Sequence, residues 1–141
     1  MSEDVQGSLV VERVFAHGPE KLWRALTEST LLAQWMMENN FVAEPGRRFE
    51  FRAKPAPNWN GLVECEVREV EPMRRLTYLW GVGGANGMLW VVEWTLTAVD
   101  GGTHVRMEQS GFNAEQKAAY QGARYGWNQF FSGLERVLEA E

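Results

Sequence analysis

Apolar residues recur with helical spacing over the last part of the chain, residues 113–139. Asn113 is a suitable N-cap, and Glu115 and Gln116 follow it in the first turn. The apolar positions lie three or four residues apart, as on the buried face of a helix: Tyr120, Ala123, Trp127, Phe130, Phe131, Leu134, Val137 and Leu138. The pattern predicts a long C-terminal helix with one buried face and with Trp127 near the middle of that face.

Three glycines interrupt this helical pattern, at Gly122, Gly126 and Gly133. Each lowers intrinsic helix stability by about 1 kcal/mol relative to alanine. Burial of four large side chains, at about 1.5–3 kcal/mol each, outweighs that cost. We therefore expect the helix to form because it packs on another element, not through its own propensity.

Earlier in the chain the pattern predicts one strand, two short helices and then five more strands. The first strand covers residues 8–15. Pro19 starts a short helix that ends before Thr27, and Ser29 or Thr30 caps a second one over residues 31–36, which the polar run 38–40 stops. The later strands are expected at residues 47–53, 61–70, 74–80, 89–98 and 103–109, with a hairpin turn at Asp100-Gly101-Gly102.

Within these strands apolar and charged residues alternate, so one face of the sheet is apolar and aromatic and the other is charged. The outer row includes Glu64, Glu66, Arg68 and Arg106. We predict a single α+β domain over residues 1–141, in which a curved six-stranded antiparallel sheet grips the C-terminal helix, with residues 1–7 disordered. The apolar row contains Phe49, Phe51, Val63, Cys65, Val67, Leu76, Tyr78, Trp80, Trp90, Val92, Trp94, Leu96, Val105, Met107 and Gln109.

Composition and charge narrow the possible partners. The 141 residues carry a formal net charge of -5 and no basic run, which disfavours nucleic acid and anionic membrane surfaces as partners. No apolar stretch approaches the length of a membrane span. The single cysteine, Cys65, excludes an internal disulfide, and the first residues lack the features of a signal peptide, so we expect a cytoplasmic protein.

No short catalytic or metal-binding motif is present. The glycine-rich stretch 81–87 departs from the nucleotide-binding pattern at Asn86 and precedes a strand, so we interpret it as a loop. His17 and His104 are far apart, and Cys65 has no paired cysteine. Ser110 ends a strand without the elbow that a serine nucleophile requires. We therefore assign no catalytic residue, metal or cofactor.

Polar residues on the apolar face are the candidates for ligand recognition. Three polar residues fall at the alternating strand positions that belong to the apolar face: Gln109, Tyr78 and Arg13. Each could be a satisfied hydrogen bond of the core, or could orient a ligand in an apolar cavity. Small residues in the first half of the long helix favour a cavity opposite the large rings of the sheet, with loops 55–60 and 81–87 as its rim. The predicted cavity residues are Phe49, Phe51, Cys65, Val67, Tyr78, Trp80, Trp94, Met107, Gln109, Ala119, Ala123, Gly126 and Trp127.

Four stretches resemble, in order and spacing, a known helix-grip family. They are PEKLWRALTESTLLAQWM, RLTYLW, WTLTAVDGGTHVRMEQSGF and YGWNQFFSGLERVLE. Together they resemble the family related to the C-terminal domain of the activator of Hsp90 ATPase, within the superfamily of START-like domains. The resemblance covers roughly residues 8–140 and implies the helix-grip (START-like) fold.

The resemblance implies several kinds of function, because a fold of this kind serves many. Its superfamily includes binders of lipids and plant hormones, polyketide cyclases, self-resistance proteins and chaperone activators. We expect a non-catalytic protein that binds a small, largely apolar or aromatic molecule between the sheet and the helix. The alternatives are a co-chaperone or stress-response interaction module that contacts Hsp90, and an enzyme of the polyketide-cyclase kind.

Overall fold

The computed structural model describes residues 7–57, 59–83 and 87–140. Residues 1–6 of the start that we predicted to be disordered lie outside this range, and Gly7 already belongs to the first strand. The elements are β1 (Gly7–Phe15), α1 (Pro19–Thr27), α2 (Ser29–Trp35), β2 (Glu38–Asn39), β3 (Arg48–Arg52), β4 (Leu62–Glu71), β5 (Arg75–Val82), β6 (Met88–Val99), β7 (Gly102–Phe112), the 3-10 helix η3 (Ala114–Gln116) and α3 (Lys117–Ala140).

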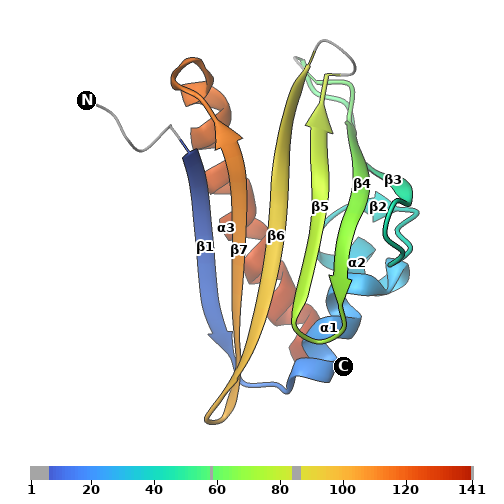
Figure 1. Ribbon diagram of the computed structural model, residues 1–141, viewed down its shortest axis with the longest axis vertical. Helices are drawn as coiled ribbons and strands as arrows, with labels where there is room; N and C mark the ends of the chain where they lie inside the picture. The colour runs from blue at the N-terminus through green and yellow to red at the C-terminus, as the bar shows by residue number, and fades with distance from the viewer. Residues whose placement is uncertain (1–6, 58, 84–86, 141) are drawn as a thin grey trace.

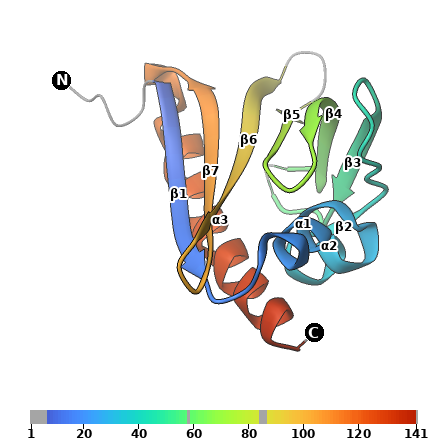
Figure 2. The ribbon, with the colours of Figure 1, turned by 60° about the horizontal axis from the view of Figure 1, so that its bottom comes forward.

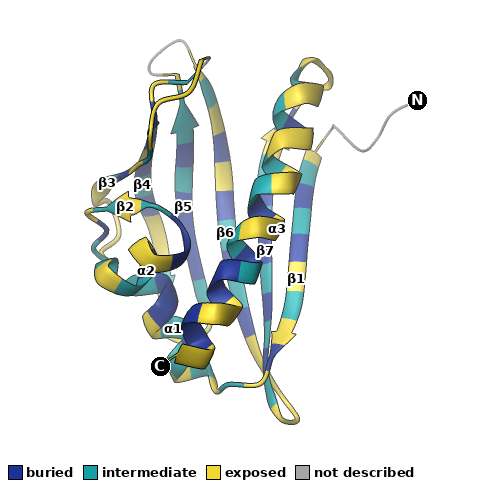
Figure 3. Cartoon of the chain, turned by 180° about the vertical axis from the view of Figure 1, so that it is seen from behind, coloured by how far each residue is buried: buried dark blue, intermediate teal, exposed yellow. Residues whose placement is uncertain are grey.

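The strands form one antiparallel sheet in the order β1-β7-β6-β5-β4-β3-β2 (Figure 1). The sheet curves, and the long helix α3 crosses one of its faces (Figure 2). Helices α1 and α2 lie on that same face, beside the C-terminal half of α3 (Figure 3). The opposite face carries no helix among the described elements. This arrangement confirms the predicted α+β helix-grip fold.

The sheet has seven strands, whereas the sequence predicted six. The additional strand, β2, pairs its two residues with Arg52 and Phe51 of β3. Its polar residues show no alternation of apolar and charged positions, so no sequence pattern indicated a strand. Side-chain hydrogen bonds hold it there: the Asn39 amide donates to the carbonyl oxygens of Ser29 and Met37, at 3.3 and 3.0 Å.

The predicted cap of the second helix is also wrong. Helix α2 begins at Ser29 itself, and Glu28 is its N-cap, without a side-chain hydrogen bond to the helix. The Ser29 hydroxyl donates instead to the carbonyl oxygen of Asn39, at 3.0 Å. A hydroxyl that caps locally in isolation is thus used here for a tertiary contact, which ties α2 to β2.

The N-terminus of the long helix is capped as predicted. The side chain of Asn113 accepts a hydrogen bond from the backbone nitrogen of Glu115, and the Gln116 side chain accepts one from the backbone nitrogen of Asn113. This reciprocal arrangement is a capping box. The first turn is a 3-10 helix, so α3 proper starts at Lys117. The buried residues of α3 are Tyr120, Trp127, Phe131, Gly133, Leu134, Val137 and Leu138.

Aromatic rings hold the C-terminal half of α3 on the sheet. The ring of Phe131 stacks on Trp94, with centroids 5.7 Å apart, and on Phe15 at 6.2 Å. Trp35 of α2 packs edge-on against Trp94 at 5.8 Å. Gly133 lies at this contact: a Cβ atom there would lie 3.4 Å from the Cβ of Trp35, which is the short limit of ordinary contact, so a side chain larger than a methyl group would displace Trp35. The glycine therefore serves the contact between α2 and α3.

We predict that Phe131→Ala lowers the free energy of unfolding by about 3–5 kcal/mol, because it removes a fully buried ring from a close-packed site. The adjacent Phe130 is only partly buried and provides a matched control. Phe130→Ala should cost about 1 kcal/mol. Urea denaturation of both variants measures the difference, and equal losses would show that the assigned buried face of α3 is wrong.

Candidate functional site: a cavity between the sheet and α3

A cavity of about 850 Å³ lies between the N-terminal half of α3 and the sheet. Its volume is within the range of about 300–1,000 Å³ that small-molecule sites occupy. Among the described residues its wall is almost entirely apolar, with Gln109 as the one amide side chain. The lining residues are Met36, Met37, Ala53, Trp59, Val63, Trp80, Val82, Met88, Trp90, Gln109, Ala118, Ala119, Gly122, Ala123, Gly126, Trp127 and Phe130.

Small residues of α3 keep this space open. A Cβ atom placed on Gly122 or Gly126 would meet no side chain within 4 Å among the described residues, and since Gly122 is exposed and Gly126 half-buried, the space beside them is open toward solvent. Ala119 and Ala123 line the same side of the cavity. Trp80 packs against Trp127 at one end of the cavity, and the small residues of α3 leave the rest of the space unfilled.

The structure divides the thirteen predicted cavity residues into two groups. Trp80, Gln109, Ala119, Ala123, Gly126 and Trp127 line the cavity. The others are absent from the cavity wall, and all of them are buried in the core: Phe49, Phe51, Cys65, Val67, Tyr78, Trp94 and Met107. They share the inner face of the sheet, but other rings cover them: Phe49 lies 4.8 Å from Phe41, and Trp94 lies 5.7 Å from Phe131.

Several lining residues were not among the predicted ones. Trp59 lies in the loop that we expected at the rim, and its indole nitrogen donates to the carbonyl oxygen of Leu62, at 2.9 Å. Met88 follows the glycine-rich loop, of which residues 84–86 lie outside the described part. Met36 and Met37 follow the last turn of α2. The sequence identifies these four residues only as apolar. It does not show whether each one faces the core or the cavity.

The three polar candidates have different surroundings. The Tyr78 hydroxyl accepts a hydrogen bond from the indole of Trp94 at 2.9 Å, inside the core. Arg13 forms an ion pair with Glu135 at 3.3 Å and lies over the Phe131 ring. Only Gln109 lines the cavity, and its Oε1 accepts a hydrogen bond of 2.7 Å from the Trp127 indole.

No ionisable side chain lines the cavity within the described residues. Nearby, burial raises the pKa of the Cys65 thiol, and the charge of Glu64 raises it further. Burial likewise raises the pKa of Tyr78, against the smaller opposing effect of the hydrogen bond from Trp94. Both groups therefore stay neutral at physiological pH, and the cavity wall offers apolar contact and hydrogen bonds but no side-chain acid or base.

The described residues also bear on two other possibilities, a metal site and a membrane-spanning helix. In the described ranges, no three His, Cys, Asp or Glu side chains are grouped so that they could hold a metal ion. Among the helices of the same residues, none is long and apolar enough to cross a membrane.

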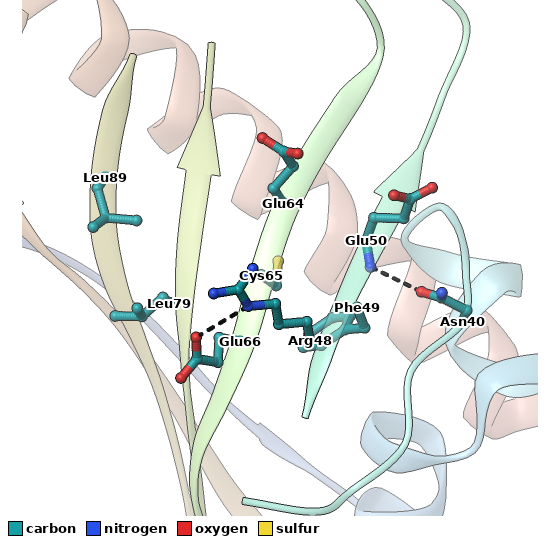
Figure 4. Close-up of a pocket in the computed structure, with 9 residues that line it drawn as sticks. All are labelled: Asn40, Arg48, Phe49, Glu50, Glu64, Cys65, Glu66, Leu79 and Leu89. Carbon is teal, nitrogen blue, oxygen red and sulfur yellow. Dashed lines mark hydrogen bonds and ion pairs between the residues drawn. The ribbon is translucent and has the colours of Figure 1, made fainter. Parts of the chain in front are cut away.

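A second hollow, of about 490 Å³, lies on the opposite face of the sheet (Figure 4). Arg48 reaches across it toward Glu66, at 3.7 Å, and the Asn40 side chain accepts a hydrogen bond of 2.8 Å from the backbone nitrogen of Glu50. The Arg48 guanidinium is exposed, and exposed ion pairs contribute little free energy. Within the described part of the chain, the wall of this hollow mixes apolar residues such as Leu79 and Leu89 with four charged side chains, so we take the inner cavity as the candidate site for an apolar ligand.

We predict that the outer charges are dispensable for the inner cavity. Glu64→Gln and Glu66→Gln should each change the free energy of unfolding by only a few tenths of a kcal/mol, because both side chains point away from the apolar face. Neither should alter the affinity of a ligand bound at the inner cavity. Denaturation curves and ligand titrations of the two variants test this, and a loss of binding with the fold intact would contradict the assignment.

Comparisons with known proteins agree with the fold. The profile of the family described as "Activator of Hsp90 ATPase homolog 1-like protein" matches residues 16–139. A search of curated proteins gave no significant match.

Several solved structures are similar to this chain. Protein MLL2253 from Mesorhizobium loti is 45% identical, with a TM-score of 0.86 over 94% of this chain and 97% of that one. DynU16, from the dynemicin biosynthetic locus, is 25% identical with a TM-score of 0.80, over 94% of this chain but 47% of its own length. BH1534 from Bacillus halodurans is 25% identical with a TM-score of 0.75, over 93% of this chain and 96% of that one. Because the family profile spans most of the sequence, the chain belongs to the activator of Hsp90 ATPase homolog 1-like family.

Proposed function

We propose that the protein binds a small, largely apolar or aromatic molecule in the cavity between the sheet and α3. The observation that carries this proposal is the apolar space of about 850 Å³, which small residues of α3 leave open opposite the tryptophans of the sheet. A close-packed core of this size would leave few voids larger than a water molecule. An apolar cavity with one or a few polar groups is the usual form of a small-molecule site.

Chemical-shift mapping tests the proposal with named probes. We expect flavone, an anthraquinone or decanoic acid, added to the isotope-labelled protein, to shift signals of α3 from Ala118 to Phe130 and of the facing strands. Shifts confined to the outer face of the sheet would favour the interaction-module alternative. Failure of all three probes to shift cavity signals would contradict the proposal.

A pair of glycine substitutions separates an open cavity from a close-packed core. Gly126→Leu places a side chain into open space and removes a helix-weakening glycine, so the melting temperature should hold or rise while flavone binding is lost. Ala123→Phe should act in the same way. Gly133→Leu is the matched control, because its side chain would meet Trp35, and it should lower the melting temperature by at least about 3 °C. Strong destabilisation by Gly126→Leu and Ala123→Phe would contradict an open cavity.

The neutral wall also predicts how binding responds to pH. Cys65 and Tyr78 are the buried acids near the wall, and burial raises the pKa of both. Each therefore stays protonated through the pH at which it would ordinarily ionise. The affinity for flavone should therefore agree within about twofold between about pH 6 and about pH 9, where free cysteines ionise. Titrations at both pH values, with the fold checked by circular dichroism, make the measurement. A larger change would reveal an ionisable group in contact with the ligand.

A further inference from the structure

The orientation of the Gln109 side chain is fixed by the chemistry of its partner. The Trp127 indole N–H can only donate a hydrogen bond, so the Gln109 atom 2.7 Å from it must be the amide oxygen. The NH₂ group of Gln109 therefore points away from Trp127. Gln109 is 1% exposed and lines the cavity. Among the described residues Thr77 Oγ1 is the buried side-chain nitrogen or oxygen that lacks a hydrogen-bond partner, so the Gln109 NH₂ group is not sealed in the core, and we take it to face the cavity.

The other polar hydrogens of the cavity wall belong to tryptophans. The indole of Trp59 donates to Leu62, and the indole of Trp90 donates to the Gln116 side chain at 3.3 Å. The NH₂ group of Gln109 is therefore the side-chain donor of this wall on which we base the inference, while one lone pair of the Gln109 oxygen is already used by Trp127.

A wall of this kind discriminates between classes of ligand. A ligand that covers an N–H group without accepting from it leaves that group unpaired, which is unfavourable, whereas a ligand oxygen that accepts from it avoids this penalty. A ligand whose polar group is a donor finds one of the two lone pairs of the Gln109 oxygen already used by Trp127, whereas both N–H bonds of the NH₂ group remain to donate. A charged ligand finds no side chain of opposite charge among the described residues of the wall.

We propose that the cavity selects uncharged, ring-sized apolar molecules that carry an acceptor oxygen, such as a ketone carbonyl, which accepts from the Gln109 NH₂ group. Trp127 sets this preference as a positioning residue, because it holds the amide oxygen and so presents the NH₂ group to the ligand. The inference rests on the proposed function, since it names the ligand class of the same cavity.

Three flat tricyclic probes of nearly equal size test the preference. 9-Fluorenone carries one carbonyl acceptor, fluorene carries no polar group, and carbazole carries an N–H donor. We expect 9-fluorenone to bind about tenfold more tightly than either of the others, the effect of satisfying one buried donor. The side-chain NH₂ signal of Gln109 should shift with 9-fluorenone and much less with fluorene, which is a measurement on the unaltered protein.

Two variants assign the preference to its residues. Gln109→Leu should remove the advantage of 9-fluorenone, so that the ratio of its affinity to that of fluorene falls to about one. The variant also leaves the Trp127 indole without its acceptor, so circular dichroism must show that it is folded. Trp127→Phe removes the indole N–H that holds the Gln109 oxygen, so the amide can turn its oxygen toward the ligand. The affinity for carbazole should then rise relative to the affinity for 9-fluorenone. Gln129→Leu, at an exposed glutamine of the same helix, should change none of the three affinities.

The outcomes separate this inference from the proposed function. Equal affinity for all three probes at the cavity would leave small-molecule binding in place and overturn the acceptor preference. Tighter binding of carbazole than of 9-fluorenone would also overturn it, since the amide would then be accepting. Absence of binding by all three would contradict the proposed function and, with it, this inference.

Discussion

The contact of α3 with the inner face of the sheet, centred on Trp127, is the interaction on which the rest of the structure depends. The Trp127 ring lies 5.1 Å from Trp80 and 5.7 Å from Trp94, so it joins two strands to the helix. Three glycines weaken the helix by itself, and burial on the sheet offsets that weakness. The helix and the curvature of the sheet therefore stabilise each other, and neither would form this surface alone.

The two halves of α3 use small residues for opposite purposes. At Gly133 the missing side chain lets Trp35 approach, and the space is filled. At Gly126 the missing side chain leaves space that no other residue fills. The same residue type thus produces close packing at one end of the helix and a cavity at the other. The difference comes from α2, which packs beside the C-terminal half of α3 (Figure 3).

The sequence predicted the main elements because their patterns are local. The alternation of the five longer strands and the capping box at Asn113 each depend on a few neighbouring residues. Strand β2 was missed because the contacts that hold it, such as the Asn39 hydrogen bonds, join distant parts of the chain. For the same reason, alternation identified the inner face of the sheet but could not separate Trp94, which Phe131 covers, from Trp80, which lines the cavity.

The fold by itself leaves the choice of ligand open, because one fold can carry many unrelated functions. That choice depends on the side chains that face the cavity, and Gln109 is the one that breaks the apolar pattern of its row. A leucine there would continue the row of Val105 and Met107 without leaving a buried amide to satisfy. The Trp127 indole satisfies only the oxygen of that amide. The other half of the group remains free to bind, so the residue that completes the core contact also defines the polarity of the site.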